Sequence, residues 1–142
     1  HFLLRKVERS NGCPVYWLLT SKGVRTYRFL PVFFNTFFPA HDCPTPAPAK
    51  RLVDEVAVAK FGGAYSPTTQ TLSHRSRRDR VRASEHEPCL LQRRDPHVRF
   101  FLDRNPGYAV GDELVCLTPM SRENLNARGR RVVDHTEVLW RD

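Results

Sequence analysis

The sequence predicts a small α+β domain, in which a mixed or antiparallel sheet packs against two or three helices. The most apolar stretch, residues 15–39, holds a strand-like run, a glycine turn and an aromatic-rich helical pattern. Helical patterns at 49–61 and 94–106 and an apolar strand at 113–117 follow it. Of the 142 residues 40% are hydrophobic, so residues 1–142 are sufficient for a single domain or domain fragment with its own core.

The composition predicts a basic cytoplasmic protein. The net charge is +8, and only four of the 23 basic residues are lysines. Arginine holds phosphate or carboxylate in a more fixed geometry than lysine does. No apolar run approaches the ~20 residues of a membrane helix, so we expect no membrane partner. The four cysteines are spread without a close pair, which favours reduced thiols over a disulfide framework. Both ends fall beside apolar runs, so we expect a fragment of a larger α/β-type domain.

The first elements predicted are two strands. Residues 2–9 and 15–20 flank an Asn-Gly turn at positions 11 and 12, which is typical of an antiparallel hairpin. The second run has three large apolar residues in succession, at positions 17–19. We therefore expect it to be covered on both faces.

A helix is predicted at residues 26–38, because Tyr27, Leu30, Phe34 and Phe37 recur at helical spacing. Three more aromatic side chains, Phe29, Phe33 and Phe38, widen this stripe, which we assign to the core. Pro31 requires that the helix either starts near Arg28 or is kinked. A stiff proline-rich linker at 39–48 follows.

The helix at 49–61 is predicted to have Thr45 as its cap and Pro46 as its first residue, and to stop at the glycine pair 62–63. A turn and a weak strand occupy 65–72. Residues 74–88 form an exposed arginine-rich loop.

The last third of the chain opens with a clear helix start, because Asp95 is a good N-cap and Pro96 a good first residue. The apolar run 113–117 predicts a buried strand, followed by a short helical turn at 118–125. Residues 128–133 look strand-like, with a turn at Gly129. Residues 136–140 fit either a final strand or the start of a helix.

The turn after the first apolar strand is the main candidate site. A glycine, two hydroxyls and two cations stand where a strand passes into a helix, and backbone N–H groups at a helix start favour an anion. We predict a pyrophosphate-binding loop made by Ser21, Lys22, Gly23, Arg25 and Thr26. It is neither a P-loop nor a GxGxxG fingerprint.

This order of strand, basic glycine turn and helix resembles the cofactor-binding half of the GNAT acyltransferase superfamily, over residues 15–61 and extending towards 133. The family's loop motif is Gln/Arg-x-x-Gly-x-Gly/Ala. Gly23 fills the first glycine position, whereas Thr20 and Arg25 depart from the motif. The resemblance implies acyl-CoA as a small-molecule cofactor and an N-terminal half of the same chain as a partner. It carries over no catalytic residue.

If the resemblance holds, strands 15–20 and 113–117 belong to one sheet, and the Lys22 turn lies at an open cleft. The alternative is a basic nucleic-acid-binding module, whose contacts to phosphate come from Arg75, Arg77, Arg78, Arg80 and Arg82. A non-catalytic structural domain of a larger protein is the third hypothesis.

Two further kinds of site are weakly indicated. A zinc set is conceivable from His41, Cys43, His86 and Cys89, but the first pair is tightly spaced and no CxxC occurs, so we expect no metal. Cys116 lies in an apolar strand and is predicted to be buried and inert.

Overall fold

The computed structural model describes residues 12–73 and 94–139, with the backbone alone for 136–139. It confirms the predicted α+β class: four helices and a four-stranded antiparallel sheet occur in this part of the chain. The elements in chain order are β1 (Tyr16–Ser21), α2 (Val24–Phe33), α3 (Ala47–Phe61), β2 (Tyr65–Ser66), β3 (Thr71–Leu72), α5 (Pro96–Arg104), β4 (Glu113–Pro119) and α6 (Ala127–Leu139). The predicted hairpin strand 2–9 and the arginine-rich loop 74–88 lie outside the described residues.

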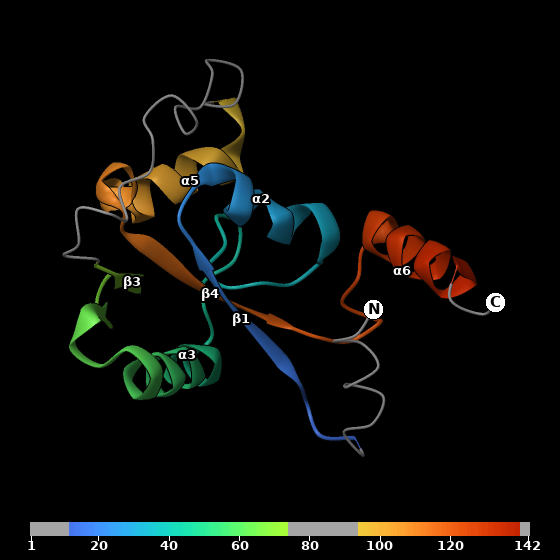
Figure 1. Cartoon of the computed structure of the whole chain (residues 1–142), viewed down its shortest axis with the longest axis horizontal. Helices are drawn as coiled ribbons and strands as arrows, with labels where there is room; N and C mark the ends of the chain where they lie inside the picture. Colours follow the sequence, from blue (N-terminus) through green and yellow to red (C-terminus); the bar gives the residue numbers. More distant parts are fainter. Residues whose placement is uncertain (1–11, 74–93, 140–142) are drawn as a thin grey trace.

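The sheet has the order β1-β4-β3-β2, so β4 has a strand on each side. Strand β1 pairs with β4 over its whole length, from Tyr16 opposite Pro119 to Ser21 opposite Leu114. The predicted strands 15–20 and 113–117 are therefore neighbours in one sheet. Helices α2 and α5 lie on one face of this sheet and α3 on the other (Figure 1).

The side chains of β4 alternate between these two layers. Leu114 and Cys116 belong to the core beneath α2 and α5, whereas Val115 and Leu117 belong to the core above α3. Every residue from 113 to 118 is buried. The prediction that 15–20 is covered on both faces is met only in part: its side chains contact both cores, but most of them are half-buried.

Tyr27 is the centre of the core between α2 and α5. Its ring packs against Phe37, Phe100 and Phe101, with centroids 5.5 to 6.2 Å apart. The buried phenol donates a hydrogen bond of 2.9 Å to the carbonyl of Pro39, so burial leaves no polar atom of this side chain unpaired.

Helix α2 is shorter than predicted at its C-terminal end. It runs from 24 to 33 with Pro31 inside it, and the chain becomes extended at Phe34. Phe34 and Phe38 instead form bridges to Leu125 and Leu117. The prediction of a helix to residue 38 was wrong. The extended segment after residue 33 pairs with β4 and buries the same aromatic side chains, so their helical spacing does not show that the backbone is helical.

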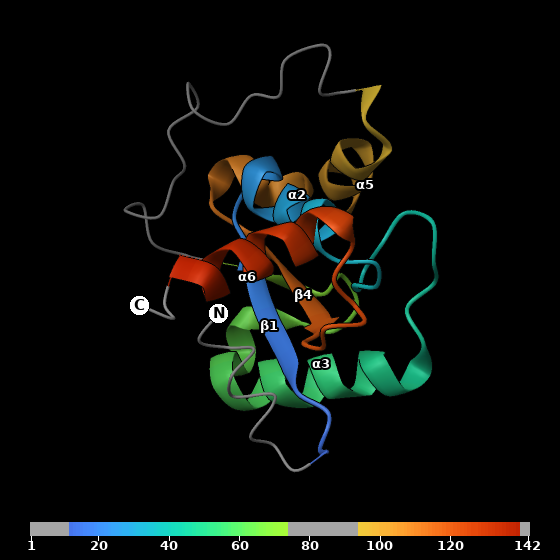
Figure 2. The ribbon, with the colours of Figure 1, turned by 90° about the vertical axis from the view of Figure 1, so that its right-hand side faces the viewer.

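Residues 128–133 are helical, so the predicted strand is wrong. Asn126 starts α6, because its side-chain Oδ1 accepts hydrogen bonds of 3.0 Å from the backbone N–H of Arg128 and of Gly129. Its Nδ2 donates to the carbonyls of Pro31 and Val32 at the end of α2. One side chain thus caps two helices and joins the start of α6 to the end of α2. Figure 2, seen from the side of α6, shows this helix crossing in front of α2 and β1.

Two predicted helix ends are confirmed. Asp95 caps α5 by accepting a 2.9 Å hydrogen bond from the backbone N–H of His97. Helix α3 ends at Phe61, and Gly62 follows with a φ of +55°. Its start differs from the prediction, because Pro46 is the N-cap and Thr45 is not.

Gly129 permits the close contact between α2 and α6. A Cβ atom at this position would lie 2.3 Å from the carbonyl oxygen of Phe33. Because that oxygen is backbone, it cannot move aside as a flexible side chain would. We expect Gly129→Ala to lower the free energy of unfolding by about 1–3 kcal/mol, measured by urea denaturation.

Gly63→Ala is the matched control, because a Cβ at Gly63 would meet nothing within 4 Å. Its effect should stay within about 0.5 kcal/mol. Equal stabilities of the two variants would show that α6 does not pack against Phe33 as described.

Candidate functional site

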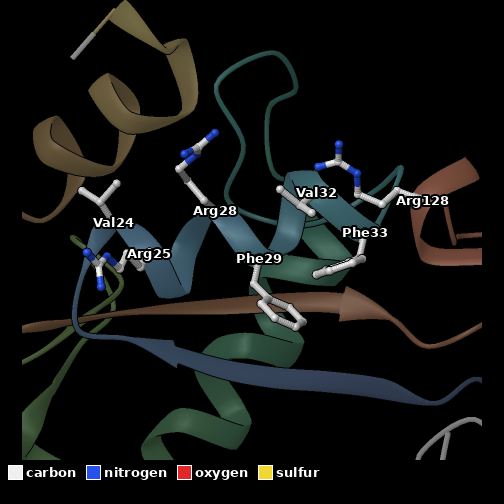
Figure 3. Close-up of a pocket in the computed structure, with 7 residues that line it drawn as sticks. All are labelled: Val24, Arg25, Arg28, Phe29, Val32, Phe33 and Arg128. Carbon is white, nitrogen blue, oxygen red and sulfur yellow. The ribbon is translucent and has the colours of Figure 1, made fainter. Parts of the chain in front are cut away.

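A groove of about 320 Å³ follows the outer face of α2 and reaches the first turn of α6 (Figure 3). It is lined by Val24, Arg25, Arg28, Phe29, Val32, Phe33 and Arg128. Helix α2 buries Tyr27 and Leu30 against the sheet, so the residues on the opposite side are turned towards the groove. The volume is at the lower end of the range for small-molecule sites, which is roughly 300–1,000 Å³.

The groove is strongly basic. Arg28 Nε lies 3.2 Å from Asp95 Oδ2, which holds this guanidinium at the α5 side. Within residues 12–73 and 94–135, no carboxylate pairs with the guanidinium of Arg25 or of Arg128. Two uncompensated guanidinium groups and a third, partly compensated one make the groove a site for an anion.

The groove also contains an aromatic surface. Phe29 is 49% exposed, and its ring lies 4.5 Å from that of Phe33, measured between centroids. Both rings extend from α2 towards β1, whereas Arg28 and Arg128 extend away from the strands (Figure 3). A ligand in the groove can therefore meet apolar ring surface on one side and cationic groups on the other.

The five residues predicted to bind phosphate are divided between the core and the surface. Ser21 is buried, with its Oγ 4.0 Å from Cys116 Sγ. Lys22 Nζ lies 3.5 Å from Glu113 Oε1, and Gly23 is the buried N-cap of α2. Arg25 and Thr26 are exposed, and of the five only Arg25 lines the groove.

The start of α2 has the features expected of an anion site. Its N-cap is a glycine, so no side chain accepts a hydrogen bond from the first-turn amides, and no acidic residue occurs in that turn. These amides carry the positive end of the helix dipole. Because Val24 and Arg25 are both first-turn residues and groove-lining residues, the groove begins at this helix end.

Sequence reasoning missed most of the groove. Phe29 and Phe33 were assigned to the core stripe, and Arg28 was considered only as a helix start. The signal in α2 was the recurrence of Arg25, Phe29 and Val32 on the side opposite Tyr27 and Leu30. Arg128 gave no such signal, because its position depends on how α6 packs.

A second cluster lies at the start of α5. The rings of His41 and His97 are 4.3 Å apart between centroids, and His97 Nδ1 is buried without a hydrogen-bond partner in the described structure. Burial and the neighbouring His41 lower the pKa of His97 below its usual range, against the opposing effect of Asp95. His97 is therefore a neutral imidazole at pH 7.

The described residues also bear on the two other chemistries that were considered from the sequence, a zinc site and a reactive cysteine. No group of three or more His, Cys, Asp or Glu side chains able to hold a metal occurs among them. His86 and Cys89 of the weighed zinc set lie outside the described ranges. Cys116 is buried as predicted, and burial raises the pKa of its thiol to about 12. The thiol is thus protonated at neutral pH and is no nucleophile.

No family model, curated protein or solved structure matches this chain. The resemblance of residues 15–61 to the GNAT superfamily accordingly remains a prediction from the sequence. Among the described residues, no helix has the length and apolar character needed to cross a membrane.

The lowered pKa of His97 predicts a loss of stability in acid. The unfolded chain binds a proton near the ordinary pKa of about 6.5, while the folded protein does not until a lower pH. Stability should therefore fall as the pH drops below about 6.5, by at most about 1.4 kcal/mol per pH unit for this proton. We expect His97→Gln to make the acid limb of a stability–pH curve shallower.

His135→Gln serves as the control, because His135 is exposed on α6. It should leave the slope between about pH 7 and pH 5 as in the unmodified protein. The assignment to His97 is wrong if both variants flatten the curve equally.

Proposed function

We propose that this protein is an acyltransferase-like domain that binds a phosphate-bearing cofactor, such as acyl-CoA, in the α2 groove. The observation that carries the proposal is that the groove begins at the N-terminus of α2. Among the described residues, no carboxylate pairs with the guanidinium groups of Arg25 and Arg128, which line this groove. The start of α2 is the same turn at which the sequence predicts a phosphate-binding loop.

The phosphates are assigned to the start of α2. The first-turn amides have no side-chain acceptor, and Arg25 adds a full charge beside them. The Thr26 hydroxyl is exposed on the same turn, and Lys22 lies just before it. The Ser21 side chain lies in the core, so its contribution comes from the backbone.

The neighbouring strands support an extended ligand arm. Within the described residues β1 has a strand partner on the β4 side, and the proposal places the ligand arm along its other edge. An amide-containing chain such as pantetheine can pair with such an edge as an added strand does. Strand β1 leads directly into the turn to which we assign the phosphates. The pantetheine arm and the phosphates of the cofactor would therefore bind at adjacent places.

The size of the groove limits what it holds. A volume of about 320 Å³ suits a nucleotide-sized head and is too small for a complete acyl-CoA. The arm and the acyl group would therefore lie outside the groove, along β1. The resemblance assigns the catalytic groups to a further half of the fold, and we assign none to the described residues.

A basic nucleic-acid-binding module is the second candidate. Its five arginines at 75–82 lie outside the described residues, but α6 also carries the exposed Arg128, Arg130 and Arg131, of which Arg128 lines the groove. Binding that falls steeply with salt and needs no free cofactor would favour it. A structural domain without a ligand remains the third hypothesis.

Coenzyme A binding tests the proposal. We expect calorimetry to detect binding by the full chain, and Arg25→Gln and Arg128→Gln to weaken it by about tenfold each, because each removes a charge-assisted hydrogen bond to phosphate. Arg51→Gln is the control, since Arg51 is exposed on α3, across the sheet from the groove.

An equal loss in all three variants would indicate a general effect of net charge rather than a site. Absence of binding by the folded, unmodified protein would remove the proposal.

A further inference from the structure

Phe29 is an unusual residue for its place. Nearly half of its surface is exposed, on the side of α2 that also carries Arg25 and Arg28. A core residue would be turned towards the sheet with Tyr27 and Leu30, and a solvated position would commonly hold a polar side chain. The ring lies instead in the groove, where it is the most exposed of the apolar lining side chains.

The ring of Phe29 is held in place before any ligand arrives. It meets Trp17 of β1 edge to face, at 6.3 Å between centroids, and Phe33 at 4.5 Å. Trp17 is itself fixed by Phe34, at 6.2 Å. A ring supported in this way loses little freedom on binding, so contact with a second flat ring is favourable.

The spacing of ring and cation matches one kind of ligand. Arg25 and Phe29 are four residues apart on α2, so their Cβ atoms are separated by one helical turn, roughly 5–6 Å. A base and the 5′-phosphate of the same nucleotide are separated on a similar scale. Inorganic phosphate or a sugar phosphate would use the arginines but gain nothing from the phenyl ring.

We propose that the α2 groove is selective for a nucleotide, whose base stacks on Phe29 while its phosphates bind Arg25 and the start of α2. This rests on the proposed function, since it names the part of the cofactor that the groove recognises. Arg128 faces the same groove from α6 and can reach a second phosphate or a ribose phosphate.

A nucleotide unit can come from a free cofactor or from single-stranded RNA, which also combines stacking on aromatic rings with cationic contacts. The groove has the volume of one unit, and Phe29 and Phe33 are the two phenyl rings that line it. We therefore assign the site to a free nucleotide rather than to a strand that would need successive platforms.

The test compares ADP with pyrophosphate, by calorimetry on the full chain. We expect Phe29→Leu to weaken ADP binding by roughly tenfold or more, because base stacking is lost, and to leave pyrophosphate binding unchanged. Arg25→Gln should weaken both. Phe29→Tyr keeps the ring and should keep ADP binding, which separates stacking from a folding defect.

Phe61→Leu is the control, since Phe61 is the last residue of α3 and packs against the core on the other face of the sheet. ADP binding by Phe29→Leu equal to that of the unmodified protein would overturn the stacking proposal and leave phosphate binding at the groove intact. Failure to bind ADP, pyrophosphate and coenzyme A alike would remove the proposed function as well. Tighter binding of a short single-stranded RNA than of ADP, with the same dependence on Phe29, would overturn the assignment to a free nucleotide.

Discussion

The burial of β4 on both faces is the constraint on which the structure depends. Each polar group brought in with this strand must find a partner inside the protein. Gln70 donates from Nε2 to the carbonyl of Val115, and Thr118 donates to the carbonyl of Thr36. Asn124 donates to the carbonyls of Thr36 and Pro119 and accepts from the Thr36 N–H. These hydrogen bonds thus fix the positions of the segments on either side of the strand. Hydrophobic packing alone, which is not directional, would not fix them.

The groove is a consequence of this arrangement. Because Tyr27 and Leu30 face the core over Leu114 and Cys116, the opposite side of α2 is turned outwards with its arginines and Phe29. Asn126 then joins the end of α2 to the start of α6, and Gly129 lets the two backbones approach closely. Arg128 stands between these two residues in sequence, so the contact that joins the helices also delivers a cation to the groove.

Local signals in the sequence were sufficient for several elements. Asp95 and Pro96 mark the start of α5, and the unbroken apolar run at 113–117 marks the buried strand. The start of α6 had a local signal in its cap Asn126, but the sequence analysis took Gly129 for a turn and so missed the helix. The end of α2 could not be predicted locally, because it depends on distant partners. Asn126 donates to the carbonyl of Pro31 from 95 residues away, and the segment after α2 forms bridges to Leu125 and Leu117. The groove was not predicted for the same reason. Most of its lining residues belong to α2 and are close in sequence, but Arg128 joins them only through tertiary packing.

The proposed function links ligand binding to the docking of α6. A phosphate-bearing ligand that contacts Arg25 on α2 and Arg128 on α6 binds only when the two helices are together, so it stabilises their contact by mass action. Conversely, loosening the Gly129 contact would move Arg128 without altering any ligand-binding group. The affinity of the groove depends in this way on the Asn126 caps, and the residues that set it extend beyond those that line it.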